Sequence, residues 1–171
     1  QPGNASRREA AECIREAFLA SLAPDVIHVC SLFEGYIDDA VTSIGRFDDT
    51  ALVSVTLYNL IPLLNPDHYL TPNPLFAEYY QRKLEYFKRA ALSLAISDAS
   101  RHEGLAHIGL PADRVVNTSA AMGADFQPIP DDDTSAARFS WHESAKRAMA
   151  AWKSLRSERQ TNPVCRSTGR K

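Results

Sequence analysis

The spacing of hydrophobic and polar residues along this chain switches between a helical and a strand-like pattern. Residues 6–22 place apolar side chains on one face and arginine and glutamate on the other, which predicts an amphipathic helix that ends at Pro24. The apolar positions of this helix are Ala10, Cys13, Ile14, Ala17, Phe18 and Ser21. Residues 74–90 show the same spacing behind a proline at the first turn, and they predict a second helix.

Four short apolar runs lack alternation, which is typical of strands that are buried on both faces of a parallel sheet. They cover residues 25–30, 51–57, 91–96 and 114–118. After the third run, Ser97 is a candidate N-cap for a helix that Gly109 and Pro111 close. The order of strands and helices predicts a layered α/β fold with a parallel sheet.

The chain changes character after residue 122, where the main domain, residues 1–122, is expected to end. Residues 123–138 contain two prolines and three successive acids and are predicted to be a linker. A closing helix is expected over residues 139–160, since Ser140 and Glu143 are spaced as a capping box. Its apolar stripe comprises Trp141, Ala145, Ala148, Met149, Trp152 and Leu155. Residues 161–171 are predicted to be a disordered basic tail.

Composition narrows the class of protein further. The 171 residues are 44% hydrophobic and 23% charged, which fits one globular domain with a real core. A formal charge of -2 gives no general attraction to nucleic acid, and we expect no such partner. No apolar run approaches the length that spans a bilayer. The three cysteines show no paired spacing, so a reducing cytoplasm is the simplest setting.

Polar residues follow three of the predicted strands, at the edge where open parallel sheets bind their ligands. The candidate site residues are Glu34, Gly35, Tyr58, Asn59, Ser97 and Arg101. A tyrosine hydroxyl can donate a hydrogen bond to a ligand hydroxyl, and an asparagine amide can both donate and accept. A helix that begins at Ser97 can hold an anion, with Arg101 one turn further on. The pattern therefore predicts a ligand site at this edge of the sheet.

Four of the six candidates have a structural alternative that the sequence leaves open. Tyr58 and Asn59 are equally suited to capping a turn after their strand. A glycine such as Gly35 is more typical of a tight turn than of contact with a phosphate. A serine at the position of Ser97 is more typical of a simple helix cap than of an anion site.

No metal site is predicted. Asp38 and Asp39 lack a third ligand; they are candidates for binding hydroxyl groups or for a solvated helix start. His102 and His107 are five residues apart, which does not place two ligands on one helix face. His28 lies in a strand of the buried type and is expected to be a satisfied core histidine.

Three segments in succession resemble the N-terminal half of family-four (group-one) glycosyltransferases of the GT-B fold. They read HVCSLFEGYIDDAVTSIG, TLYNLIPLLNPDHYL and YYQRKLEYFKRAALSLAISDASRHEGLAHIGLPADRVVNTSAA, within roughly residues 5–130. The segment FSWHESAKRAMAAWKSL resembles the terminal helix of the same enzymes, which crosses back to the first domain. The resemblance implies a Rossmann-like three-layer parallel sheet, part of a GT-B N-terminal domain, with a closing C-terminal helix.

The resemblance also implies a retaining glycosyltransferase that uses a nucleotide-sugar donor in polysaccharide or lipopolysaccharide biosynthesis. This chain would carry the acceptor-side domain only, because no segment matches the donor domain or the early strands and glycine-rich loop. Tyr58 and Asn59 stand where relatives commonly have His or Tyr followed by Asp, so a charge-based role for Asn59 is in doubt. No catalytic residue is assigned, no cofactor is expected, and we expect this chain alone to be inactive.

The implied partners follow from that chemistry. A nucleotide-sugar donor would bind through a domain not present here, and a glycan or lipid-linked acceptor would bind this one. The location would be cytoplasmic, with the basic tail touching the inner face of the membrane. The edge beside residues 25–30 would be open to self-association. The alternative function is a non-catalytic remnant or an engineered α/β module that binds a glycan or a partner.

Overall fold

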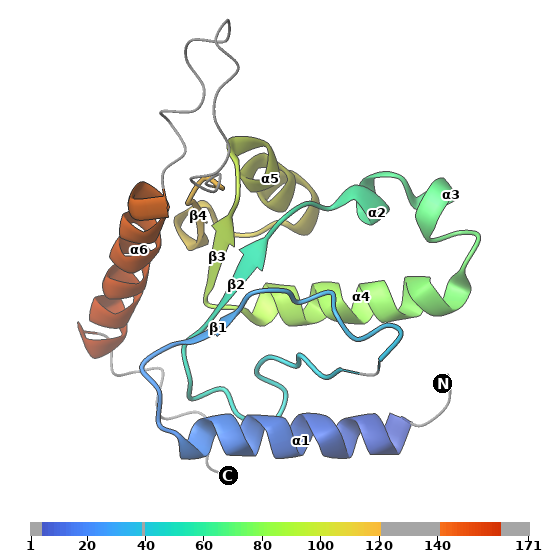
Figure 1. The fold of residues 1–171 in the computed structure, drawn as a ribbon, viewed down its shortest axis with the longest axis horizontal. Helices are drawn as coiled ribbons and strands as arrows, with labels where there is room; N and C mark the ends of the chain where they lie inside the picture. Colours follow the sequence, from blue (N-terminus) through green and yellow to red (C-terminus); the bar gives the residue numbers. More distant parts are fainter. Residues whose placement is uncertain (1–4, 39, 121–140, 162–171) are drawn as a thin grey trace, which may run out of the picture.

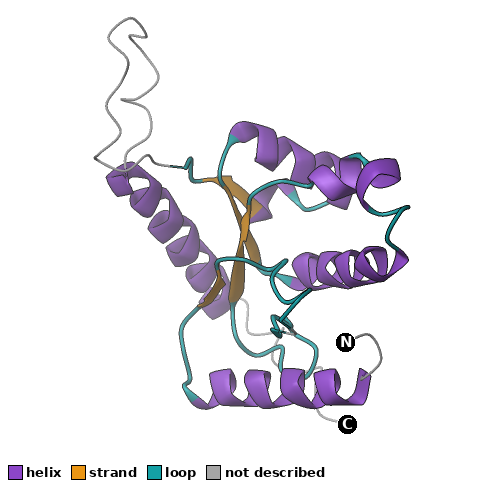
Figure 2. Ribbon diagram, turned by 45° about the vertical axis from the view of Figure 1, so that its right-hand side comes forward, coloured by secondary structure: helices purple, strands orange, loops and turns teal. Residues whose placement is uncertain are grey.

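The computed structural model describes residues 5–38, 40–120 and 141–161. They form three layers, with a parallel sheet between helices on its two faces (Figure 1 and Figure 2). The sheet has the order β1-β2-β3-β4, and every pair of neighbouring strands is parallel. The strands are β1 (Ile27–Val29), β2 (Val53–Leu57), β3 (Leu92–Ala95) and β4 (Val115–Asn117). The predicted α/β class with a parallel sheet is confirmed, and each strand is shorter than its apolar run.

Helices cover both faces of the sheet. Helix α4 (Pro74–Arg89) connects β2 to β3, and α5 (Asp98–Glu103) with a π-turn (Gly104–Ile108) and a 3-10 turn (Ala112–Arg114) connects β3 to β4. Helix α6 (Trp141–Thr161) lies on the opposite face (Figure 2). Two short helices, α2 (Ile61–Leu64) and α3 (Pro66–Tyr69), follow β2. No helix in the described ranges is long and apolar enough to cross a membrane.

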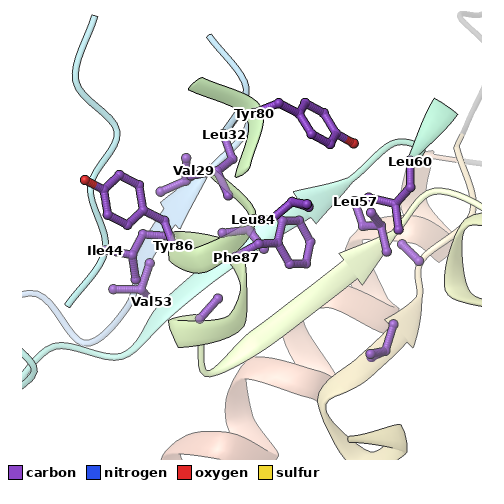
Figure 3. Packing of buried hydrophobic residues seen from close by; sticks show 14 of the residues in the cluster. Val29, Leu32, Ile44, Val53, Leu57, Leu60, Tyr80, Leu84, Tyr86 and Phe87 are labelled. Carbon is purple, nitrogen blue, oxygen red and sulfur yellow. The ribbon is translucent and has the colours of Figure 1, made fainter. Parts of the chain in front are cut away.

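The main core lies between α4 and the sheet (Figure 3). Leu57, Leu60 and Phe87 are fully buried there, and Leu84 is nearly so. Helix α4 begins as its sequence predicts, with Pro74 in the first turn and the Asn73 side chain accepting a hydrogen bond from the Phe76 amide. The helical periodicity of residues 74–90 therefore predicts this helix correctly.

Polar side chains on the other face of the sheet meet α6. His28 hydrogen-bonds Ser54 Oγ through Nδ1 at 2.8 Å and Thr56 Oγ1 through Nε2 at 3.1 Å. Trp152 Nε1 donates to Ser54 Oγ at 3.0 Å, and the rings of Trp152 and His28 form an edge-to-face pair with 5.6 Å between their centroids. Burial lowers the pKa of His28. The prediction that His28 is a satisfied histidine is confirmed, and Trp152 is the residue of α6 that contacts it.

The buried face of α6 is rotated relative to its predicted stripe. Ala148, Trp152 and Leu155 are partly buried, but Ala145 and Met149 face solvent. The Trp141 side chain and Ser140 lie outside the described residues, as do the predicted linker (123–138) and the tail from residue 162 onward. Polar contacts with the sheet and its loops, such as the one through Trp152, set the orientation of this helix.

Helix α1 (Ala5–Ser21) turns its charged face inward and its apolar face outward. Glu12 and Glu16 are only 2% and 5% exposed, whereas Ile14 and Phe18 are 70% and 61% exposed. An amphipathic helix ordinarily buries its apolar stripe. The sequence pattern therefore predicts the helix correctly and gives no sign of its unusual orientation.

Specific hydrogen bonds explain this orientation. Glu12 accepts from the Tyr86 hydroxyl at 2.7 Å and from Arg46 Nη1. Glu16 accepts from the backbone N–H groups of Arg46, Phe47 and Asp48 at 3.1, 2.7 and 3.0 Å. Charge-assisted hydrogen bonds of this kind are about twice as strong as neutral ones, so they outweigh burial of the apolar stripe.

The segment after β1 is an extended loop, not a helix. Asp38 Oδ1 accepts from the Ala40 amide at 3.2 Å, and no helix lies between residues 40 and 52. The helix-start explanation of Asp38 is therefore wrong, because its carboxylate closes a short turn. Asp39 lies outside the described residues. In the part of the chain that is described, β1 is an edge strand.

A candidate ligand site at the carboxyl edge of the sheet

The carboxyl ends of β2 and β3 are joined through Ser100. Its Oγ donates to the Tyr58 carbonyl at 2.5 Å, and its backbone N–H donates to Ser97 Oγ at 3.1 Å. Tyr58 remains 50% exposed. The structure therefore brings Tyr58 and Ser97 together at one edge, and leaves a phenol ring open to a ligand.

A turn held by Glu103 follows Tyr58. Asn59 Oδ1 accepts from the Ile61 amide at 3.2 Å, and the Leu60 amide donates to Glu103 Oε2 at 2.8 Å. Asn59 thus caps the turn through its carbonyl oxygen. This bond does not use the amide nitrogen, which leaves Asn59 a donor for a ligand.

The start of α5 suits an uncharged ligand better than an anion. Ser97 caps the helix, and Asp98 places a carboxylate in the first turn. Arg101 Nε donates to the Val115 carbonyl at 3.0 Å, so this side chain fastens α5 to β4. A carboxylate already occupies the positive end of the helix, which disfavours a second negative charge.

The residues at the end of β4 and just after it also lie at this edge, which the sequence did not indicate. Ser119 has a left-handed backbone with φ of 57°, stabilised by a hydrogen bond of 2.8 Å from its N–H to Asn117 Oδ1. Arg147 of α6 donates to Ser119 Oγ at 3.0 Å, and Asn117 donates to Asp98 Oδ1 at 2.8 Å. Polar side chains of α5, β4 and α6 therefore continue the edge that Tyr58 and Ser97 begin.

Glu34 lies apart from Tyr58 and Ser97, and its contacts are with α4 and with Ser31. Its carbonyl oxygen accepts from Lys83 Nζ at 2.9 Å and from the Tyr79 hydroxyl, and its Oε1 accepts from Ser31 Oγ at 2.9 Å. Among the described residues, no hydrogen bond or ion pair links Glu34 to Tyr58 or Ser97. The loop after β1 is thus tied to α4.

Gly35 makes the tight turn that its sequence context favours. Its φ is +101°, a region that other residues rarely adopt. A Cβ atom at this position would lie 2.0 Å from the Ala40 carbonyl oxygen. The backbone of the loop therefore closes on itself at Gly35, in the way a glycine alone permits.

A buried lysine, missed by the sequence analysis, holds this loop. Lys83 is 3% exposed and donates to the Glu34 carbonyl and, at 2.5 Å, to Thr42 Oγ1. It forms no ion pair with a described carboxylate. Burial lowers the pKa of Lys83 to about 8. The available signal was its position on the buried face of α4, beside Tyr80 and Leu84 and one turn before Phe87.

Lys83 should make stability depend on pH. Its folded pKa is about 8, whereas the unfolded value is 10.5, so above pH 8 the unfolded chain binds the extra proton and stability rises with pH. We expect unfolding free energy to increase by about 2 kcal/mol between roughly pH 7.5 and 9.5. Urea titrations at both values measure this. Lys83→Met should remove most of the increase, and an unchanged slope in that variant would contradict the assignment.

No three His, Cys, Asp or Glu side chains within residues 5–38, 40–120 and 141–161 are grouped as ligands for a metal ion. The edge is instead built from hydroxyl, amide and carboxylate groups next to one exposed phenol ring. Such groups are suited to hydrogen-bonding a polyhydroxylated ligand.

Comparison with known proteins gives three similar sequences. The chain is 40% identical over 126 residues to the serotype-specific mannosyltransferase WbdA of Escherichia coli. Two further sequences of that name from the same species are 38% identical over 126 residues. No protein-family model matches the chain, and no solved structure matches it.

The similarity extends over most of this chain but a small part of each relative. The matched segment is 74% of this chain and 15% of each mannosyltransferase. The chain therefore spans about 15% of the length of the curated relatives it matches. The similarity relates this chain to one part of a mannosyltransferase.

Proposed function

We propose that this chain is the acceptor-side part of a retaining, family-four glycosyltransferase of the GT-B fold. The observation that carries the proposal is the 40% identity over 126 residues to a mannosyltransferase. The parallel sheet with a polar carboxyl edge supports it, because this is where open α/β sheets bind ligands. The name of the relatives makes mannose the sugar to test first, in the assembly of a polysaccharide or lipopolysaccharide.

In this proposal the edge positions a sugar acceptor. Tyr58 and Asn59 offer a phenol and an amide to sugar hydroxyls, and Ser97 lies next to them through Ser100. An acceptor hydroxyl held in place gains reactivity because its attack on the donor sugar no longer requires a chance encounter. The negative charge of Asp98 fits an uncharged glycan, and Arg101 stabilises the edge by its bond to β4. Glu34 and Gly35, on the loop after β1, share no hydrogen bond with Tyr58 or Ser97, and they would contact the acceptor from that separate loop.

The donor side of the reaction belongs to polypeptide outside this chain. Transfer from a nucleotide sugar requires that the diphosphate leaving group be neutralised. Hydrogen bonds within the chain already position the two arginines near this edge, Arg101 through Nε to the Val115 carbonyl and Arg147 through Nη1 to Ser119 Oγ. We therefore expect the isolated chain to bind acceptor without turnover. The reaction would take place at the cytoplasmic face of the membrane, with the basic tail near anionic headgroups.

Binding of mannose-containing oligosaccharides to the isolated chain tests the proposal. We expect chemical-shift changes on titration to map to residues at the ends of β2 and β3. Tyr58→Ala should weaken binding about tenfold, since one sugar contact of stacking and hydrogen-bonding type contributes about 1–1.5 kcal/mol. Asn59→Ala should weaken it about threefold, with thermal unfolding recorded for each variant.

Tyr69→Ala is the matched control, because Tyr69 is 41% exposed on α3 and not at the strand ends. It should bind like the unmodified chain. Equal loss in both tyrosine variants, or no binding of any glycan by the unmodified chain, would argue against an acceptor site. Release of nucleoside diphosphate from a panel of nucleotide sugars should stay at background, and robust turnover would show that the donor site lies within this chain.

The second candidate function is a non-catalytic α/β module that binds a glycan or a protein partner. Asn59, at the position where the resembled enzymes commonly have aspartate, favours this candidate. The two proposals differ in the longer polypeptide. A transferase loses turnover when Tyr58 is replaced, whereas a binding module shows no turnover to lose.

A further inference from the structure

The outward face of α1 is an exposed apolar surface. Ile14, Phe18 and Leu22 lie four residues apart and are 70%, 61% and 59% exposed. We call this surface the α1 outer stripe; it comprises Ala10, Cys13, Ile14, Ala17, Phe18, Ser21 and Leu22. The three large side chains alone expose on the order of 400 Å² of apolar area, in the range of the largest patches on ordinary monomers, which often mark interaction sites.

The helix cannot bury this stripe by rotating about its axis. Half a turn would withdraw Glu12 from Tyr86 and Glu16 from the three backbone N–H groups that it accepts. Arg15 would also lose its hydrogen bond of 2.7 Å to the Ser43 carbonyl. Each buried carboxylate would then be unpaired, which is costly in a protein interior. The stripe is therefore held outward by the polar contacts behind it.

The chemistry of the stripe favours another protein surface over a lipid surface. Helix α1 contains three arginines and three glutamates, so it has no excess of positive charge. Helices that lie on anionic membranes are rich in Lys and Arg on their polar face. From Ala10 to Leu22 the stripe carries no charged residue, and Arg7 lies on the same face one turn earlier. Its partner should therefore present an uncharged apolar face along most of the contact.

The stripe is complementary to itself when two copies run antiparallel. With a two-fold axis at Ile14, the large Phe18 of one copy faces the small Ala10 of the other, and the two Ile14 side chains meet. Large residues opposite small ones allow two helices to pack at the usual distance of 8–10 Å. We propose that the α1 outer stripe binds a second copy of this chain through an antiparallel pair of α1 helices.

The expected dimer is weak. Standard interfaces bury about 800 Å² on each partner, roughly twice what the three large residues provide. We expect a dissociation constant of about 10–100 μM, so the population of dimer should change within reach of ordinary protein concentrations. Sedimentation velocity between about 5 and 300 μM measures this change, with monomer at the low end and mostly dimer at the high end.

Two substitutions test whether dimerisation uses the α1 outer stripe or another exposed apolar surface. Phe18→Asp places a charge in the stripe and should shift the dissociation constant at least tenfold, while circular dichroism confirms that the chain is folded. Leu75→Asp is the control, because Leu75 is 51% exposed in the first turn of α4 and an acid is favourable there. It should dimerise like the unmodified chain.

Cys13 supplies a geometric test, since it lies beside the proposed axis and is exposed. In a chain with Cys30→Ser and Cys165→Ser, a short bismaleimide should give a covalent dimer through Cys13. A chain that keeps only Cys30, which is also exposed and follows β1, should not be linked. Linking through Cys30 instead would show pairing at the β1 edge and overturn the proposal.

Three further results would overturn it. The chain could stay monomeric at 300 μM, it could dimerise equally well with Phe18→Asp, or it could bind vesicles of anionic lipid through the stripe and not itself. Each result is independent of glycan binding at the carboxyl edge. Failure of this proposal and failure of the proposed function are therefore distinguishable.

Discussion

Replacing Glu12 with alanine is expected to lower the free energy of unfolding by about 3 kcal/mol, the low end of the range for breaking a buried ion pair. Glu12 is 2% exposed and accepts hydrogen bonds from Tyr86 and Arg46. Its removal leaves the buried Tyr86 hydroxyl without an acceptor and half of the Arg46 pairing undone. The low end applies because the Arg46 side chain is 31% exposed and water can partly replace the carboxylate.

Glu9→Ala is the matched control for Glu12→Ala. Glu9 binds the same guanidinium group at 3.0 Å, but its side chain is 54% exposed. An exposed pair contributes about 0.2–1 kcal/mol, so this variant should unfold almost like the unmodified chain. Urea unfolding followed by circular dichroism measures both. If the two variants lose the same amount of stability, the buried network does not fix α1.

Gly35→Ala is expected to destabilise the chain by about 3 kcal/mol, because backbone strain and a steric clash act together. The φ of +101° is unfavourable for alanine, and the new Cβ would lie 2.0 Å from the Ala40 carbonyl oxygen. A backbone oxygen cannot move aside as a flexible side chain can. The loop must therefore open, which also weakens the contacts of Lys83 with Glu34 and Thr42.

Gly45→Ala is the control that separates backbone strain from the steric clash at Gly35. Gly45 also has a positive φ, +56°, but a Cβ there has no atom within 4 Å. Only the conformational cost of about 1 kcal/mol should remain. Thermal and urea unfolding of both variants give the comparison. A Gly35 variant no less stable than the Gly45 variant would mean that the loop around Ala40 is not closed as described.

Apolar spacing was enough to predict the sheet and α4. The four strand runs and residues 74–90 follow patterns whose burial requires no particular partner, only another apolar surface. For α1 the same pattern was misleading about orientation. Glu12 and Glu16 find their partners in a loop some thirty residues further on and in α4, and a periodicity within one helix contains no information about either.

The candidate site was predictable only in outline. The positions of Tyr58 and Ser97 follow from topology, since parallel strands end at one edge. Ser100, which joins them, and Glu103, which holds the turn after Tyr58, were missed because their bonds span about forty residues of chain. The left-handed Ser119 was missed for a similar reason, because α6 supplies part of its support.

The hydrogen bonds of Glu16 to the loop at residues 46–48 limit which residues can vary there. The carboxylate binds main-chain N–H groups and not side chains. Glu16 therefore constrains position 47 through its main-chain N–H alone, which excludes proline. The Phe47 side chain makes a separate contact, because the Arg46 guanidinium lies over its ring at 5.2 Å from the ring centroid. A library randomised at codon 47 should therefore be depleted of proline, whereas a library randomised at codon 16 should retain almost nothing but glutamate.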